Sequence, residues 1–309
     1  MRWWGVLRVH VAAVPLTALL LAGCMSSTPG SGSVDRPASS PSGTPSAAPT
    51  SPTATIPPPV PSKTRSPRST PQTSPTPSRS TPAAPPHRPA GALTVVLNPG
   101  HNGGNATHTA AINRQVPAGY GEYKACDTTG TTTNAGYPEH AFNWDVALRV
   151  RTILRAQGIR VVLTRPDDSG VGPCVDERAA IGNHANVAAV VSIHADGAPS
   201  SGHGFHVNQD SRRPDGATAG VAQRSVALGQ AVHAALVRSS GLVPSTYIGT
   251  NGYYYRSDLA GLNLARRPAT FLELGNMRNA GDADLQSSAT GRARIADAVA
   301  AGILAFLGR

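Results

Sequence analysis

The stretch at residues 97–104, LNPGHNGG, decides how the rest of the sequence is interpreted. It follows a β-branched run, so it predicts a strand that ends in a glycine-rich turn carrying His101. Three later polar residues have comparable positions: Glu139 begins a predicted helix, His194 follows the apolar run AAVVSI, and Glu273 follows ATFL. Because an open α/β sheet collects its functional groups at the carboxyl ends of its strands, we expect these four side chains to converge.

Strand-like and helix-like runs alternate between residue 91 and the C-terminus at residue 309. Short β-branched or apolar runs predict strands, and apolar residues at helical spacing predict helices. Strands are expected at 93–97, 159–164, 188–193, 204–208 and 269–274, and helices at 140–157, 176–185, 221–237 and 295–307. The sequence therefore predicts a single α/β domain with a mainly parallel, helix-flanked sheet.

Residues 102–138 differ from the rest of this domain, because they are rich in Gly and Thr and show little apolar periodicity. We expect a long functional loop here. It contains Cys126, and the other cysteine of the domain is Cys174. In an exported protein such a pair is best explained as a disulfide, which would pin the loop, whereas two unpaired thiols are the alternative.

The N-terminus has the pattern of an export signal. Arg2 and Arg8 precede an apolar run at 9–22, which is too short to span a bilayer. The run closes with LAGC at 21–24, which resembles the lipobox of bacterial lipoproteins. This resemblance implies a signal peptide at 1–23, lipidation of Cys24, and a membrane anchor on the outer face of the cytoplasmic membrane, facing the cell wall. An ordinary signal peptide with a chance cysteine is the alternative.

Residues 24–90 are expected to form a disordered tether. Positions 25–90 hold 18 prolines and 25 serines or threonines, a composition that cannot bury enough apolar surface to fold. The tether also carries much of the net charge of +10, because residues 91–309 have 19 Lys and Arg against 16 Asp and Glu. We therefore expect a weak attraction of the tether to anionic lipid or wall polymer, and no nucleic-acid partner.

The four polar residues suggest zinc chemistry. Catalytic zinc sites have three protein ligands and one open position for water, and His101, Glu139 and His194 supply that number. No dense motif such as HExxH is present. Each residue alone also has an explanation without metal. A histidine after a strand is often an ordinary loop residue, and a glutamate at the start of a helix is favoured there by the helix dipole.

Four motifs strengthen the zinc interpretation: VVLNPGHNGGN, EHAFNWDVALRVRTILRAQGIRVVLTR, VDERAAIGNHANVAAVVSIHADG and ATFLELGNMRN. In this order they resemble the zinc-dependent N-acetylmuramoyl-L-alanine amidases, the Amidase_3 family, over about 95–307. The resemblance implies one Zn²⁺ held by His101, Glu139 and His194, with Glu273 as the catalytic carboxylate. It also implies cleavage of the amide between the lactyl group of N-acetylmuramic acid and L-alanine in peptidoglycan. Asn98 is a departure, since the family usually has Asp there.

Other residues have weaker claims. Arg178 matches a frequent arginine of the family and is expected to be structural. The remaining candidate histidines are weak ligand candidates, with His203 and His206 expected on opposite faces of one strand: His108, His140, His184, His203 and His206.

Two alternatives to an amidase stay open from the sequence. One is a wall-binding lipoprotein that keeps the fold without activity, and the other is a zinc peptidase that cuts within the stem peptide. In each case the expected partner is peptidoglycan, and the chain is expected to be a monomer.

Overall fold

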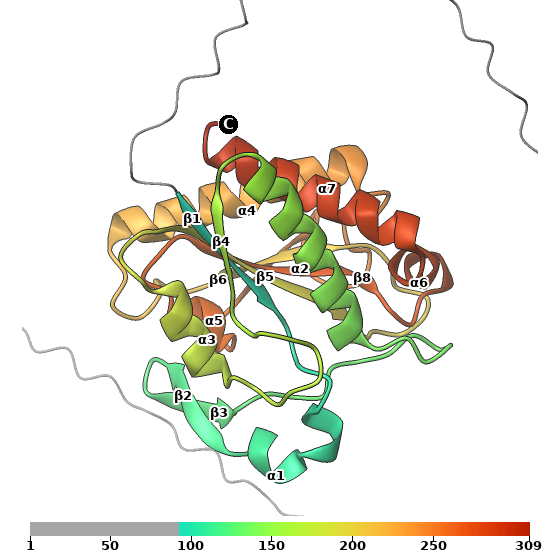
Figure 1. The fold of residues 1–309 in the computed structure, drawn as a ribbon, viewed down its shortest axis with the longest axis horizontal. Helices are drawn as coiled ribbons and strands as arrows, with labels where there is room; N and C mark the ends of the chain where they lie inside the picture. Colours follow the sequence, from blue (N-terminus) through green and yellow to red (C-terminus); the bar gives the residue numbers. More distant parts are fainter. Residues whose placement is uncertain (1–92) are drawn as a thin grey trace, which may run out of the picture. The chain divides into compact units, whose positions relative to one another are not determined.

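The apolar run before His194 forms β5, Val187–Asp196, a central strand of a six-stranded sheet (Figure 1). The computed structural model describes residues 93–309. Its sheet has the order β4-β1-β5-β8-β6-β7, and every neighbouring pair is parallel except β6 and β8. The other strands are β1 Thr94–Pro99, β4 Arg160–Leu163, β6 His206–Asp210, β7 Tyr253–Arg256 and β8 Ala269–Asn276. The predicted mainly parallel, helix-flanked sheet is confirmed.

Three long helices cover one face of the sheet: α2 Glu139–Ala156, α4 Ala219–Ser239 and α7 Ala289–Phe306. In α2, apolar side chains recur at about one turn of the helix and are fully buried against β1 and β5: Phe142, Val146, Val150 and Leu154. This spacing lets one stripe of the helix enter the core, which is the largest apolar cluster of the domain.

The opposite face of the sheet carries α3 Val175–Gly182 and α5 Ala260–Asn263 over a smaller apolar cluster. Alternate residues of β1 divide between the faces, with Val95 and Leu97 in the large core and Val96 in the smaller one. By the same alternation His194 and Glu273 point to the α3 and α5 side, because their strand neighbours Ile193 and Leu272 lie in the large core.

Residues 102–138 contain more regular structure than expected. They form η1 Asn105–Thr107, α1 Thr109–Ile112 and a hairpin of β2 Gln115–Gly119 with β3 Glu122–Ala125. The hairpin escapes the apolar-periodicity signal because β3 is largely exposed. Its tip is held by the Tyr120 hydroxyl, whose single hydrogen has two acceptors within reach, the Asp210 carboxylate and the Arg213 carbonyl.

The predicted disulfide between Cys126 and Cys174 is present, with Cα atoms 4.4 Å apart. Both cysteines are buried. Cys174 is the N-cap residue of α3, so the bond joins the end of the hairpin segment to the start of that helix.

Outside residues 102–138, three further short elements were not predicted: β7, α5 and α6 Ala280–Ser287. Each is too short to display a clear period. The prediction for the C-terminal helix also starts too late, since α7 begins at Ala289, where the Ser288 hydroxyl caps it by accepting from the Gly291 amide. Its first turn has few large apolar residues, so periodicity alone misses it.

The predicted signal peptide at 1–23, the lipidation site Cys24 and the tether at 24–90 lie outside the described residues. Among residues 93–309, no helix has the length and apolar character needed to cross a membrane.

Candidate metal centre

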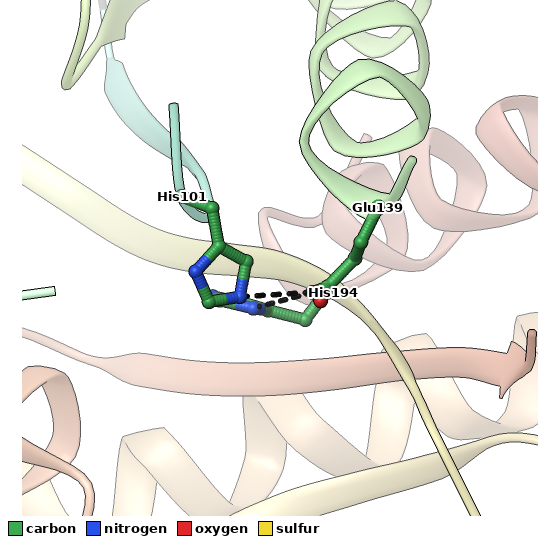
Figure 2. Close-up of side chains that lie close together, drawn as sticks. All are labelled: His101, Glu139 and His194. Carbon is green, nitrogen blue, oxygen red and sulfur yellow. Dashed lines mark hydrogen bonds and ion pairs between the residues drawn. The ribbon is translucent and has the colours of Figure 1, made fainter. Parts of the chain in front are cut away.

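Three of the predicted site residues meet at one point (Figure 2). His101 lies in the turn after β1, Glu139 is the first residue of α2, and His194 lies within β5 rather than beyond its end. His101 Nε2 is 3.2 Å from Glu139 Oε1, and His194 Nδ1 is 2.9 Å from the same oxygen. One nitrogen or oxygen atom from each residue therefore faces a shared position, with all three atoms within 4.8 Å of one another.

Two glycines make room for this arrangement. A Cβ atom on Gly100 would lie 1.9 Å from Cε1 of the His194 ring, so no other residue fits there without moving the ring. A Cβ on Gly130 would lie 2.7 Å from Glu139 Oε2 and 2.8 Å from His101 Cδ2. His101 itself has φ of 58°, a left-handed conformation that is uncommon for a non-glycine residue and typical of functional sites.

His101 is oriented by Asp127, a residue the sequence analysis did not single out. His101 Nδ1 lies 3.1 Å from Asp127 Oδ1 and 3.0 Å from the Thr128 carbonyl, which directs Nε2 toward Glu139. A carboxylate behind a histidine is the usual support for a metal-binding imidazole. In the sequence, Asp127 is marked only by its position next to Cys126 in a long glycine-rich segment.

Arg178 has the structural role expected of it. Its buried guanidinium donates to the carbonyls of Pro99 at 2.8 Å and His101 at 3.0 Å, and to Asp127 Oδ2 at 3.1 Å. It therefore fixes both the turn that carries His101 and the carboxylate that orients it.

Asn98 uses both ends of its amide. Its Nδ2 donates to Ser192 Oγ at 3.0 Å, and its Oδ1 accepts from Thr164 Oγ1 at 2.7 Å and Arg178 Nη1 at 3.1 Å. An aspartate here would lack the donor for Ser192, so the asparagine is satisfied in this chain.

Glu139 is held by backbone and side-chain donors. Oε2 accepts from the Thr131 amide at 3.0 Å, while Oε1 accepts from the Ala195 amide and from Asn143 Nδ2, each at 3.2 Å. The imidazole of His194 is fixed separately by stacking on Phe271, with ring centroids 4.2 Å apart. Little rearrangement is therefore available to these two side chains.

The electrostatics of the centre favour a positive charge. Burial lowers the pKa of His101, but the charge of Glu139 and the hydrogen bonds to Asp127 and Glu139 outweigh it and raise this pKa to about 10. Burial raises the pKa of Glu139, but the two histidines lower it well below its ordinary value. A cation between these side chains would be stabilised by the same carboxylates.

Glu273 joins His101 and His194 in lining a cavity of about 240 Å³. It lies in register with His194 of β5, and among the described residues it forms no ion pair with Arg266 or Arg278. Burial, followed by the charges of Glu139 and Asp196, raises its pKa well above the ordinary value. Lys124 and Arg256, which the sequence analysis did not identify, line the same cavity.

The weaker histidine candidates do not belong to the cluster. His140 pairs with Asp168, His108 bonds the Gly104 carbonyl, and His184 lines a separate hollow with Thr94 and Val187, at the start of β1 and β5. The expected strand does not contain both His203 and His206, because β6 begins at His206.

The fold and site define an α/β protein in which two histidines and a glutamate, side chains able to hold a metal ion, meet at the carboxyl edge of the sheet. The family model described as N-acetylmuramoyl-L-alanine amidase, Amidase_3, matches residues 95–305. The chain belongs to this family.

Individual similar proteins are named as amidases of the same kind. Over 228 residues the chain is 47% identical to N-acetylmuramoyl-L-alanine amidase Rv3717 of Mycobacterium tuberculosis, with 74% of this chain and 91% of that protein covered. The crystal structure of the amidase Ami1 from Mycobacterium smegmatis has a TM-score of 0.65 at 47% identity, covering 70% of this chain and 97% of Ami1. The crystal structure of Ami1 from Mycobacterium abscessus has a TM-score of 0.65 at 50% identity, covering 69% of this chain and 98% of that Ami1.

Proposed function

We propose that this chain is a zinc-dependent peptidoglycan hydrolase that cleaves the amide between the lactyl group of N-acetylmuramic acid and the L-alanine of the stem peptide. The observation that carries this proposal is the meeting of His101, Glu139 and His194 beside a cavity that Glu273 also lines. Family membership supports the choice of substrate.

The three side chains fit zinc. Two imidazole nitrogens and one carboxylate oxygen are a common catalytic zinc set, and three protein ligands leave a coordination position for water or substrate. Asp127 behind His101 supplies the outer support that such sites require. Bound zinc would supply Lewis-acid polarisation of the scissile carbonyl and a lowered pKa for water.

Glu273 is the proton carrier in this proposal. Its carboxylate takes a proton from the attacking water as the water oxygen bonds to the carbonyl carbon, and it returns a proton to the alanine nitrogen as the carbon–nitrogen bond breaks. The raised pKa suits this task, because a carboxyl group that titrates nearer neutral pH can hold a proton between the two steps. Asp127 and Arg178 keep His101 in place throughout.

Mass spectrometry of digested peptidoglycan tests the reaction. The amidase yields intact stem peptides that begin with L-alanine, together with glycan that has lost its peptides. Shortened stems would instead indicate a peptidase, and an unchanged polymer with a zinc-loaded protein would indicate a binding protein. The amidase is favoured over these because relatives named as amidases are 47–50% identical over 69–74% of the chain.

We further propose that the chain is exported and anchored by a lipid on Cys24, so that the domain acts from the outer face of the cytoplasmic membrane. The support is the sequence LAGC at 21–24 after an apolar run. A tether at 24–90 would let the domain reach the cell wall, and a monomer suffices because one chain supplies all four side chains.

A further inference from the structure

A row of three polar residues crosses the sheet next to the metal centre. Glu273 of β8 is paired with His194 of β5 on one side and with His206 of β6 on the other. Val207 and Leu272, the strand neighbours of His206 and Glu273, lie in the large core, so all three polar side chains project to the α3 and α5 face. His206 therefore stands beside Glu273 on the side opposite His194.

His206 and Glu273 each have a buried polar atom without a partner. His206 Nδ1 and Glu273 Oε2 form no hydrogen bond among the described residues. Buried polar groups without partners are costly, so an unpaired pair at a catalytic centre needs an explanation. The imidazole nitrogen can donate a hydrogen bond and the carboxylate oxygen can accept one, so the two atoms are complementary partners.

The two groups are within reach of each other. Directly paired residues of antiparallel strands have Cβ atoms about 4.5–5.5 Å apart, and both side chains extend beyond Cβ. The side chains of His206 and Glu273 are long enough to let an imidazole nitrogen and a carboxylate oxygen meet across a pair of this spacing.

The surroundings of His206 favour a neutral ring with a single N–H. His206 is 1% exposed, and its ring lies roughly perpendicular to the rings of Tyr247 and Tyr254, with ring centroids 6.0 Å away in each case. Burial lowers its pKa to about 4. Among residues 93–309 no hydrogen bond joins the His206 ring to a carboxylate, and Asp196, whose charge acts on the ring, accepts from the Tyr247 hydroxyl at 3.0 Å.

We propose that His206 is a positioning residue for Glu273, donating its Nδ1–H to Oε2 and leaving Oε1 free to face the cavity and exchange a proton. This inference rests on the proposed function. A carboxylate fixed by one oxygen presents the other in a constant direction, so losing the bond affects turnover rather than substrate binding.

Three substitutions separate this role from simple packing. His206→Phe keeps a ring in contact with the two tyrosines but removes the donor. His206→Asn keeps an N–H close to the position of Nδ1, whereas His206→Gln moves it toward the position of Nε2. His233→Phe is the matched control, because His233 also contacts a tyrosine ring, being stacked on Tyr253, but it lies in α4 and is not paired with Glu273.

With zinc-loaded full-length protein and peptidoglycan fragments, we expect kcat to fall about tenfold or more in His206→Phe, with KM and zinc content unchanged. His206→Asn should recover much of this loss and His206→Gln should not. The control should match the wild type. Wild-type turnover in His206→Phe, or equal kcat in the Asn and Gln variants, would overturn the proposal.

A second measurement does not depend on activity. Long-range proton–nitrogen NMR of the zinc-loaded protein should show His206 protonated at Nδ1, with a signal that moves in Glu273→Gln. Protonation at Nε2 instead, or a signal indifferent to Glu273→Gln, would refute the bond. If the wild type releases no stem peptides, the proposed function fails, while this spectrum still decides the role of His206.

Discussion

His101 and Asp127 are joined across the long loop: Nδ1 of the imidazole lies 3.1 Å from Oδ1 of the carboxylate, so that Nε2 faces Glu139. Asp127 is itself held by Arg178 at 3.1 Å. Burial raises the pKa of Asp127, but the hydrogen bond with His101 and the charge of Arg178 outweigh it and keep this pKa low. The carboxylate is thus ionised and fixed behind one of the three proposed ligands.

Replacing Asp127 with Asn should lower zinc affinity about 10- to 100-fold, because the imidazole loses the charged acceptor that orients it. Competition with a chromophoric chelator measures the affinity. Asp145→Asn is the control, since Asp145 pairs with Arg149 and Arg292 on α2 and α7, away from the centre. An Asp127→Asn variant with wild-type affinity would show that His101 needs no such support.

Zinc binding should release a proton. His101, with its pKa raised to about 10, is protonated at neutral pH in the metal-free protein and must lose that proton to bind metal. Zinc affinity should therefore rise close to tenfold per pH unit between about pH 7 and 9. Calorimetry in buffers of different ionisation enthalpy counts the protons, and an affinity independent of pH would contradict this reasoning.

The raised pKa of His101 also affects the stability of the metal-free protein, and this effect changes with pH in the opposite direction to zinc affinity. A raised pKa in the folded state stabilises the metal-free protein fully below the ordinary value of 6.5, and this contribution disappears as the pH rises through about 10. Alkaline pH should thus weaken the metal-free fold while strengthening zinc binding.

The disulfide should contribute substantially to stability. Cys126 and Cys174 are 48 residues apart, and closing a loop of this length stabilises a fold by about 4 kcal/mol in the chain-entropy model. The double substitution of both cysteines by Ser should therefore lower the free energy of unfolding in urea, and zinc affinity should fall as well because Asp127 adjoins Cys126. Two titratable thiols in the unfolded, unreduced protein would disprove the bond.

Lipidation of Cys24 predicts a change of location. Replacing Cys24 with Ala should move the protein from the membrane fraction to the soluble fraction, because the proposed anchor is covalent lipid. A variant that still sediments with membranes after a salt wash would show that some other segment holds it there.

The sequence predicted the sheet and the meeting of His101, Glu139 and His194, the sheet from its apolar runs and the three residues from the family motifs that contain them. The strands around His194 and Glu273 are continuous apolar runs, and their ends identify the edge where polar side chains meet. The hairpin at 115–125 and strand β7 were missed because they are short and partly exposed. Lys124 of the hairpin and Arg256 of β7, which line the cavity, were therefore missed as well.

The role of Asp127 and the proposed role of His206 went unpredicted for a different reason. Neither belongs to a local motif, and each gains its role only from long-range contacts, Asp127 from the turn after β1 and His206 from an antiparallel strand that follows it by more than 60 residues. Register between strands distant in sequence cannot be read from spacing alone.

The central claim is that His101, Glu139 and His194 hold one zinc ion while Glu273 moves the proton. Metal analysis of purified variants, with turnover recorded on the same samples, tests it most directly. We expect zinc and activity to be lost together in His101→Ala and His194→Ala. Glu273→Gln should keep one zinc per chain while turnover falls about 10²- to 10⁴-fold. A full equivalent of zinc in both histidine variants, or its loss from Glu273→Gln, would contradict the assignment.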